Sequence, residues 1–233
     1  MEAVILAGGK GSRLMPHTAE VPKPMVPVGG RPIIEILLSR FRKAGVTKVH
    51  LAVNHLAEQI EAHLRDGSKL GLEIVYSKED QPLSTVGPIR LMRDLPDSFI
   101  VANGDVLTDL SVKELFDFHR EHGAELTVAT CHRHDRIDYG VLDTDDNNTV
   151  TGFIEKPSYS FRVSMGIYVF SKSILDVVPQ GKPFGFDELV LEMLRQKRRV
   201  MSFPYTGYWR DIGRPEDYAQ VQEDIVEIKG LVE

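Results

Sequence analysis

Residues 2–14 read EAVILAGGKGSRL, an apolar segment that runs directly into a glycine-rich loop. The apolar part, residues 2–7, is predicted to be a buried β-strand. The glycines let a ligand approach the backbone closely, and the bare N–H groups of such a loop can bind phosphate oxygens. Arg13 adds a planar guanidinium for bidentate contacts to oxygen, and Lys23, between two prolines that stiffen its backbone, adds a point charge. The stretch therefore predicts a polyphosphate site.

This loop is neither of the two best-known phosphate-binding motifs. The dinucleotide fingerprint G-x-G-x-x-G, counted from Gly9 and Gly11, would require a glycine where Leu14 stands. The nucleoside-triphosphatase motif G-x-x-x-x-G-K-[ST] also fails, because Gly9-Lys10 is followed by Gly11 and the upstream glycine is missing. We therefore expect a phosphate loop of another kind.

Length and composition narrow the class of protein. A chain of 233 residues is one large domain or two small ones, and 42% hydrophobic with 27% charged residues is ordinary for a globular protein. The net charge of −6 argues against a nucleic-acid partner. Cys131 is the single cysteine, which rules out an intramolecular disulfide. No apolar run approaches the roughly 20 residues of a membrane span, and the N-terminus enters a core strand without a leader, so we expect a cytoplasmic protein without a membrane partner.

The first half of the chain alternates predicted strands and helices. Helices are expected at residues 33–44 and 56–64, and strands at 48–53 and 72–76. This alternation predicts an α/β fold with a mainly parallel sheet and right-handed crossovers. Ligands of such sheets bind at the carboxyl ends of the strands, where the glycine loop lies.

Another buried strand, at residues 99–102, ends in Asn103-Gly104-Asp105. Mg²⁺ takes hard oxygen ligands and is often held by one or two carboxylates together with phosphate oxygens and water. Asp105 is therefore a candidate magnesium ligand. A lone aspartate after a strand is more often a turn residue, so this interpretation depends on its combination with the opening loop.

The loop G-G-x-G-[ST]-R-L followed by P-K-P resembles the signature of the sugar-1-phosphate nucleotidylyltransferases. Later segments resemble elements of the same family: Y-G-V at residues 139–141, E-K-P at 155–157 and W-x-D-I-G-R-P at 209–215. The resemblance extends over residues 3–218 and implies a three-layer, Rossmann-like nucleotidyltransferase fold (GT-A-like) with a mixed, mainly parallel central sheet.

The resemblance also implies how the chain is divided and which residues act. Residues 1–233 would form a single domain, with a nucleotide-binding half at 1–130 and a sugar-phosphate-binding half at 131–233. The implied catalytic residues are Arg13, Lys23, Asp105 and Asp211, and the two aspartates are also the implied magnesium ligands. The implied nucleotide-binding residues are Leu6, Ala7, Gly8, Gly9, Gly11, Ser12, Arg13, Lys23, Gln81, Ser84, Thr85, Gly87, Asn103 and Gly104. The implied sugar-phosphate-binding residues are Tyr139, Gly140, Glu155, Lys156, Ser164 and Gly166, the first four on a hairpin expected to return to the cleft.

Three positions depart from the family pattern. In the loop that usually reads P-L-G-T-A-G, Ser84 and Val86 replace a glycine and an alanine. Val86 is expected to add bulk where a nucleobase would stack, and Thr85 to cap a helix at residues 89–93. Ser164 stands where the family commonly has asparagine, so its contact to a sugar would be shorter.

The implied reaction condenses a nucleoside triphosphate with a sugar 1-phosphate, with Mg²⁺ as cofactor, to a nucleoside diphosphate-sugar and pyrophosphate. The N-G-D triplet and the P-K-P-M loop favour GTP with mannose 1-phosphate or a manno-configured heptose 1-phosphate. Alternatives stay open: CTP, UTP or dTTP with a glucose-type sugar 1-phosphate, a glycosyltransferase of a related fold, or a non-catalytic sensor of sugar nucleotides. Assembly into a homo-oligomer also stays open.

Overall fold

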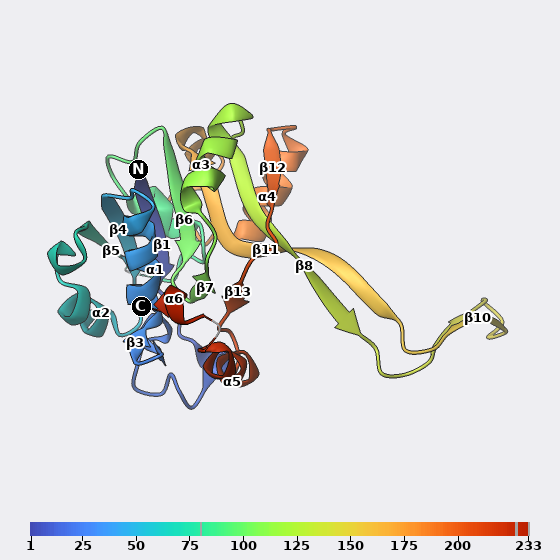
Figure 1. The fold of residues 1–233 in the computed structure, drawn as a ribbon. Helices are drawn as coiled ribbons and strands as arrows, with labels where there is room; N and C mark the ends of the chain where they lie inside the picture. Colours follow the sequence, from blue (N-terminus) through green and yellow to red (C-terminus); the bar gives the residue numbers. More distant parts are fainter. Residues whose placement is uncertain (80, 227, 233) are drawn as a thin grey trace.

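A seven-stranded sheet forms the centre of the computed structural model, which describes all residues except 80, 227 and 233 (Figure 1). The strand order is β12-β8-β11-β6-β1-β4-β5. Strand β11 is antiparallel to its neighbours β6 and β8, and the other neighbouring pairs are parallel. The strands are β1 (Glu2–Ala7), β4 (Lys48–Val53), β5 (Glu73–Lys78), β6 (Ser98–Asn103), β8 (Leu126–Arg136), β11 (Ser158–Ser171) and β12 (Val200–Pro204). The predicted mixed, mainly parallel sheet is confirmed.

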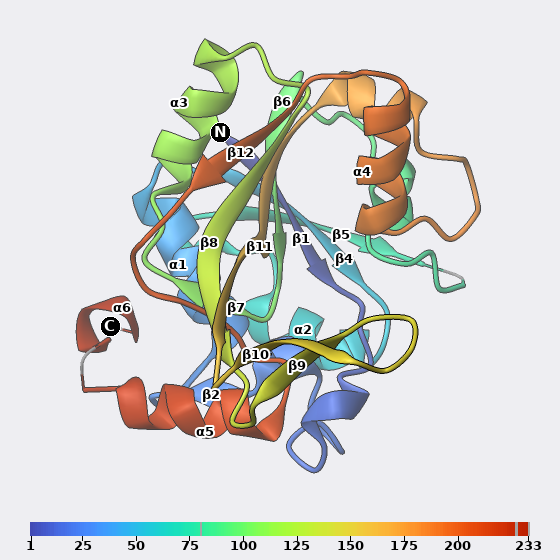
Figure 2. The same ribbon diagram turned by 90° about the vertical axis from the view of Figure 1, so that its right-hand side faces the viewer.

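Helices cover both faces of this sheet and make three layers (Figure 2). The apolar cluster on one face contains Ile5 of β1 and residues of α1, α2 and α3, and the cluster on the other face contains Val4 of β1 and residues of α4. Neighbouring residues of β1 thus enter opposite cores, as expected for a strand buried on both sides. The helices are α1 (Ile33–Lys43), α2 (Ala57–Leu64), α3 (Val112–Glu121), α4 (Phe186–Arg195), α5 (Pro215–Asp224) and α6 (Lys229–Val232). Among the described residues, no helix is long and apolar enough to cross a membrane.

Short elements connect the opening loop to the C-terminal segment. The 3₁₀ turns η1 (Ser12–Leu14) and η2 (Lys23–Met25) follow β1, and β2 (Pro27–Val28) pairs with β3 (Arg31–Pro32). Strand β7 (Val106–Thr108) pairs with β13 (Trp209–Asp211). Leu14, Leu107 and Ile212 share a third apolar cluster with residues of α1 and α5. The segment after β1 and the C-terminal segment are therefore packed together beside the carboxyl edge of the sheet.

Two strands extend far beyond the body of the protein. Strands β8 and β11 continue as a two-stranded ribbon that ends in the hairpin of β9 (Val141–Thr144) and β10 (Val150–Ile154) (Figure 1). We call residues 132–163 the arm. The predicted hairpin is present, but the expectation that it returns to the cleft is wrong, because β8 and β11 keep pairing without interruption from Thr130↔Ser164 to Arg136↔Ser158.

A buried histidine of α3 gives a prediction about stability. His119 is 1% exposed, and hydrogen bonds join its Nδ1 to the Thr127 hydroxyl (2.9 Å) and its Nε2 to the Ser171 hydroxyl (3.0 Å). Burial lowers the pKa of His119 to about 4. As the pH falls below about 6.5, the unfolded chain binds a proton here before the folded protein does, so the free energy of unfolding decreases with falling pH.

We expect this histidine alone to cost about 2 kcal/mol of stability between pH 7 and pH 4.5. Urea unfolding of the wild type and of His119→Asn at both pH values measures it, because the variant lacks the titrating group. The difference between the free energies of unfolding of the two proteins should narrow by that amount at the lower pH. Parallel pH profiles for the wild type and His119→Asn would contradict the expectation.

Candidate active site

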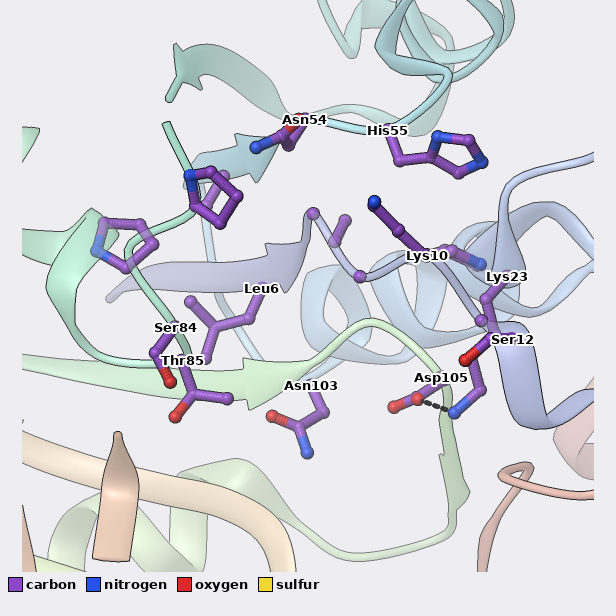
Figure 3. Close-up of a pocket in the computed structure, with 18 of the residues that line it drawn as sticks. Leu6, Lys10, Ser12, Lys23, Asn54, His55, Ser84, Thr85, Asn103 and Asp105 are labelled. Atoms are coloured by element: carbon purple, nitrogen blue, oxygen red, sulfur yellow. Dashed lines mark hydrogen bonds and ion pairs between the residues drawn. The ribbon is translucent and has the colours of Figure 1, made fainter. Parts of the chain in front are cut away.

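A cleft of about 620 Å³ lies at the carboxyl ends of β1, β4, β5 and β6. Its position is the one expected from the strand order and the glycine loop. Most of the residues expected to bind nucleotide line it: Leu6, Ala7, Gly8, Gly9, Gly11, Ser12, Arg13, Lys23, Ser84, Thr85 and Asn103. Asp105 and Asp211 line it as well. Figure 3 shows Lys10, Asn54 and His55 on one side of this cleft and Asn103 and Asp105 on the other.

The geometry of the glycine loop explains why Gly8 and Gly11 cannot readily be replaced by a larger residue. Gly11 has φ +64°, and a Cβ there would lie 3.0 Å from the Thr18 methyl carbon and 3.1 Å from Cβ of Lys23. A Cβ on Gly8 would lie 3.0 Å from Glu79 Oε1 and 3.3 Å from Cβ of Asn54. A larger residue at either position would push the loop away from its neighbours and change the floor of the cleft.

Lys23 lies between the two aspartates that the sequence analysis selected. Its ammonium donates to Asp105 Oδ2 and lies 3.9 Å from Asp211 Oδ1 (Figure 3 shows the Lys23–Asp105 pair). The side chains of Lys23 and Asp105 are only 12% and 18% exposed. The pairing of β7 with β13 sets Asp211 opposite Val106, the residue after Asp105, and so joins carboxylates that are far apart in sequence.

The two carboxylates fit a divalent cation. Asp105 Oδ1 is buried and has no hydrogen-bond partner among the described residues. Burial raises the pKa of Asp211, the charge of Asp105 raises it further, and Lys23 and Arg13 oppose this rise. Within the described part of the chain, no three or more His, Cys, Asp or Glu side chains gather as a metal group. A cation here would therefore take two carboxylates and complete its shell with phosphate oxygens and water, as Mg²⁺ commonly does.

A second cleft, of about 1320 Å³, adjoins the first. It is lined by the base of the arm and by residues 205–217. Arg13, Asp211 and Gly213 line both clefts. The Arg13 guanidinium and the Asp211 carboxylate thus lie where the two clefts meet.

The loop at residues 81–88 differs from expectation at several points. Val86 is 1% exposed and packs in the core beside α4, so it does not add bulk to a base site. Residues 87–91 form a single 3₁₀ turn, η4 (Gly87–Leu91), in place of the helix expected at 89–93. The Thr85 hydroxyl does not cap this turn and accepts instead from the N–H of Phe186, at the start of α4 (2.9 Å). The cause is tertiary: Phe184 O accepts from the N–H groups of both Val86 and Gly87 and holds the loop against the segment before α4.

Three residues expected to bind nucleotide have structural contacts and are not among the residues lining the cleft. Gln81 Nε2 donates to Gly181 O (3.3 Å). A Cβ on Gly87 would lie 2.9 Å from Cβ of Leu83. Gly104 donates its N–H to Leu6 O (2.9 Å), and a Cβ there would lie 3.2 Å from the same oxygen. Each of these residues shapes the chain beneath or beside the cleft.

Ser84 is the departure from the family pattern that does reach the cleft. Its φ is +64°, a conformation that suits the glycine of the family pattern. We expect Ser84→Gly to raise the free energy of unfolding by about 0.5 kcal/mol. Glycine removes the steric strain of an L-residue in the left-handed region, and this gain slightly exceeds the cost of the additional backbone entropy that glycine loses on folding. The matched change Ser158→Gly, in an extended strand, should lower it by about 0.5–1 kcal/mol. Denaturant unfolding of both variants checks this, and a destabilised Ser84→Gly protein would contradict it.

Ser164 and Gly166 lie at the inner end of the arm. Ser164 Oγ donates to the Tyr168 hydroxyl (3.1 Å) and accepts from the Gly166 N–H (3.3 Å), at a shift in the β8–β11 register. Gly166 has φ +72°, and a Cβ there would lie 2.8 Å from Asn103 Nδ2. This bulge brings Gly166 beside Asn103, which lines the cleft, and bulges often lie beside active sites.

The other four residues expected at the sugar phosphate lie on the arm, away from both clefts. Tyr139 is 78% exposed. Gly140 and Glu155 are neighbours, since a Cβ on Gly140 would lie 3.3 Å from Glu155 Oε2 and 2.5 Å from the ring of Phe153. Lys156 has φ +45°. The structure therefore groups these residues on the hairpin but does not bring them to the cleft of their own chain.

The cleft also contains residues that the sequence analysis missed: Lys10, Asn54, His55 and Glu79. Asn54 and His55 follow β4, and Glu79 follows β5, so the rule that singled out Asp105 after β6 could have found them. Glu79 Oε2 accepts from the Leu83 N–H (2.6 Å) and anchors the 81–88 loop. Burial raises the pKa of Glu79, and this hydrogen bond opposes the rise.

The three-layer sheet and the glycine-rich loop at its carboxyl edge define a Rossmann-like α/β protein, and sequence comparison identifies the family. The sequence profile described as "Nucleotidyl transferase" matches residues 2–228. The chain therefore belongs to the nucleotidyl transferase family, and the family prediction from the opening loop is confirmed.

Two curated relatives show the likeness in more detail. The chain is 37% identical over 223 residues to a protein named mannose-1-phosphate guanylyltransferase catalytic subunit beta from Drosophila pseudoobscura pseudoobscura, with 93% of this chain and 60% of that protein covered. It is 37% identical over 232 residues to mannose-1-phosphate guanylyltransferase from Mycobacterium tuberculosis, with 97% and 65% covered. The chain thus spans about three-fifths of the length of these relatives.

Solved structures agree with the fold. The crystal structure of HddC from Yersinia pseudotuberculosis has a TM-score of 0.75 and 30% identity, with 96% of this chain and 99% of that chain covered. A second structure of that protein is described as complexed with GMP-PN, at 28% identity. A structure described as a putative glucose-1-phosphate thymidylyltransferase from Bacillus anthracis has a TM-score of 0.78 at 20% identity, which supports the fold alone.

Proposed function

We propose that this protein condenses GTP with mannose 1-phosphate, or with a manno-configured heptose 1-phosphate, to the GDP-sugar and pyrophosphate. The observation that carries the proposal is the convergence of Arg13, Lys23, Asp105 and Asp211 where two clefts meet. One cleft has a glycine-rich floor suited to a nucleotide, and the other is open to a second substrate. The names of the curated relatives support guanine and mannose as base and sugar.

The proposed chemistry is a direct displacement. An oxygen of the sugar phosphate forms a bond to the α-phosphorus, and the bond from that phosphorus to the α–β bridging oxygen breaks. The attacking oxygen is already negatively charged, so neither a general base nor a covalent enzyme intermediate is needed. Catalysis then consists of alignment and of stabilising the charge on the departing pyrophosphate.

Each of these four side chains has a role in the proposed reaction. Arg13 and the N–H groups of the glycine loop would hold the β- and γ-phosphates, and Lys23 would neutralise charge at the α-phosphate or the leaving group. Asp105 and Asp211 would hold Mg²⁺, which supplies Lewis-acid neutralisation of phosphate oxygens when bound. The Lys23 ammonium pairs with Asp105 and lies 3.9 Å from Asp211 Oδ1, so it is placed beside both carboxylates.

Pyrophosphate release in the presence of Mg²⁺ tests the proposal. The assay pairs each of five nucleoside triphosphates with mannose, glucose, galactose and manno-heptose 1-phosphates. We expect the fastest release with GTP and a manno-configured sugar phosphate, and no release when either substrate is left out. Binding of GTP without release in any pairing would favour a non-catalytic nucleotide-binding protein, and release with another base would overturn the assignment of guanine.

A further inference from the structure

The outer part of the arm projects away from the rest of the described chain (Figure 1), and we propose that it crosses to a second copy of the protein. In the resulting two-fold dimer, the arm of each copy covers the second cleft of the other copy. It places Glu155 and Lys156 beside the partner's Arg13. The argument for the dimer does not depend on the proposed function, whereas the role of Lys156 at the sugar phosphate rests on it.

Exposed apolar side chains are concentrated on the arm. Among the described residues, eight of the fourteen exposed large apolar side chains lie within residues 137–161. Phe153 is 61% exposed and Tyr139 78%. A two-stranded hairpin without a covering layer is marginally stable in water, so a surface of this kind is expected to be covered.

The arm holds its outer residues away from its own cleft. β8 and β11 pair without interruption from Ser164 to Ser158, so the ribbon continues straight over this length. Lys156 lies eight residues beyond Ser164, which corresponds to roughly 25 Å along an extended strand. Its side chain therefore faces solvent or another molecule, and not the cleft beside Gly166.

Two of the predicted sugar-binding residues, Gly140 and Glu155, lie on the same face of the hairpin as the apolar pair Leu142 and Phe153. Leu142 is opposite Phe153 in the β9–β10 ladder. Because side chains alternate along a strand, Gly140 and Glu155 share the face of that pair. Leu142 and Phe153 are 55% and 61% exposed. A partner that covers the apolar pair would therefore also contact Glu155.

The size of the surface fits a dimer of this chain. The exposed fractions of all eight apolar side chains, taken over both faces of the arm, correspond to roughly 800 Å², which is about the area each partner buries in a stable protein interface. Exchange of identical elements satisfies both copies at once, because a two-fold axis makes each arm the cover of the other copy.

The residues that line the second cleft indicate that the partner is a second copy of the chain. The second cleft carries Arg13, Arg210 and Arg214 but lacks the four arm residues that resemble sugar-phosphate contacts. A second copy would supply these four residues from one hairpin, with Gly140 and Glu155 on the face of Leu142 and Phe153. Any other protein would cover the arm and leave the second cleft without them.

The mass in solution and a crosslink test the dimer without any assay of activity. Light scattering should give twice the chain mass of 26.2 kDa for the wild type. The variant Leu142→Asp should give the monomer mass, and Leu191→Asp, an equally polar change at an exposed residue of α4, should stay dimeric. A photoreactive phenylalanine analogue at position 153 should crosslink to residues 205–217 of a second chain. A monomeric wild type, or crosslinks confined to one chain, would overturn the proposal.

Complementation tests the shared site. Asp105→Asn keeps an intact arm, and Lys156→Ala keeps an intact cleft. Co-expressed with different tags and purified as the mixed dimer, the two variants should form one complete site and recover about half of the wild-type activity, at least tenfold above either parent. Activity no higher than that of the parents would overturn the shared site. If the wild type itself releases no pyrophosphate, the proposed function fails, and mass and crosslink still decide the dimer.

Discussion

Replacing Asp105 with asparagine should lower kcat for pyrophosphate release by about 10³-fold, the scale on which loss of one positioned charge-stabilising group acts. Asp105 Oδ1 is buried without a hydrogen-bond partner among the described residues, and Oδ2 accepts from Lys23. Asparagine keeps the shape but removes the charge that a cation and Lys23 both require. Initial rates with saturating GTP and mannose 1-phosphate, over a range of Mg²⁺ concentrations, measure the loss.

The control for this variant is Asp117→Asn. Asp117 lies on α3, where its carboxylate pairs with Lys113 at an exposed surface. Its replacement should leave kcat within about twofold and stability within about 0.5 kcal/mol. An Asp105→Asn protein with near-normal kcat and an unchanged Mg²⁺ requirement would show that this carboxylate does not serve the reaction.

Lys23→Met should reduce kcat by about 10²–10³-fold and also destabilise the ligand-free protein. Removal of the ammonium leaves the Asp105 and Asp211 carboxylates close together, with their mutual repulsion no longer offset. We expect a loss of about 2 kcal/mol, below the value for a fully buried pair because Asp211 is half exposed. Mg²⁺ without nucleotide should restore part of this stability, since it would replace the missing positive charge.

Thermal unfolding with and without MgCl₂ measures this effect. The comparison is Lys48→Met, which removes the lysine of a surface pair with Glu73 (3.1 Å) and should change the Tm little, with no added response to Mg²⁺. If Mg²⁺ raised the Tm of Lys23→Met no more than that of Lys48→Met, the carboxylate pair would not be a cation site.

The local sequence is sufficient to predict the core of the fold and one side of the cleft. The first strand, its glycine loop and the Asn-Gly-Asp turn are continuous segments whose pattern sets their structure, and parallel strands bring their carboxyl ends together at one edge. Asp211 could be placed only through the family resemblance, because its position depends on the pairing of β13 with β7.

The errors arose where packing between distant segments decides the outcome. Val86 faces the core because Phe184 holds its loop from the other side, a contact that no local pattern records. The sequence predicts the hairpin of β9 and β10, but the direction of that hairpin depends on how far β8 and β11 remain paired. Pairing length is a property of two strands together, so neither strand alone could reveal the arm.

Exchange of labelled pyrophosphate into GTP tests the central claim most directly. If a sugar phosphate displaces pyrophosphate at the α-phosphorus, label should enter GTP when GDP-mannose and Mg²⁺ are supplied, because the reaction then runs in reverse. No label should enter when GTP and pyrophosphate are incubated without a sugar substrate. Exchange without a sugar substrate would show that the enzyme carries the nucleotide covalently, and no exchange with any nucleotide-sugar would contradict the proposed reaction itself.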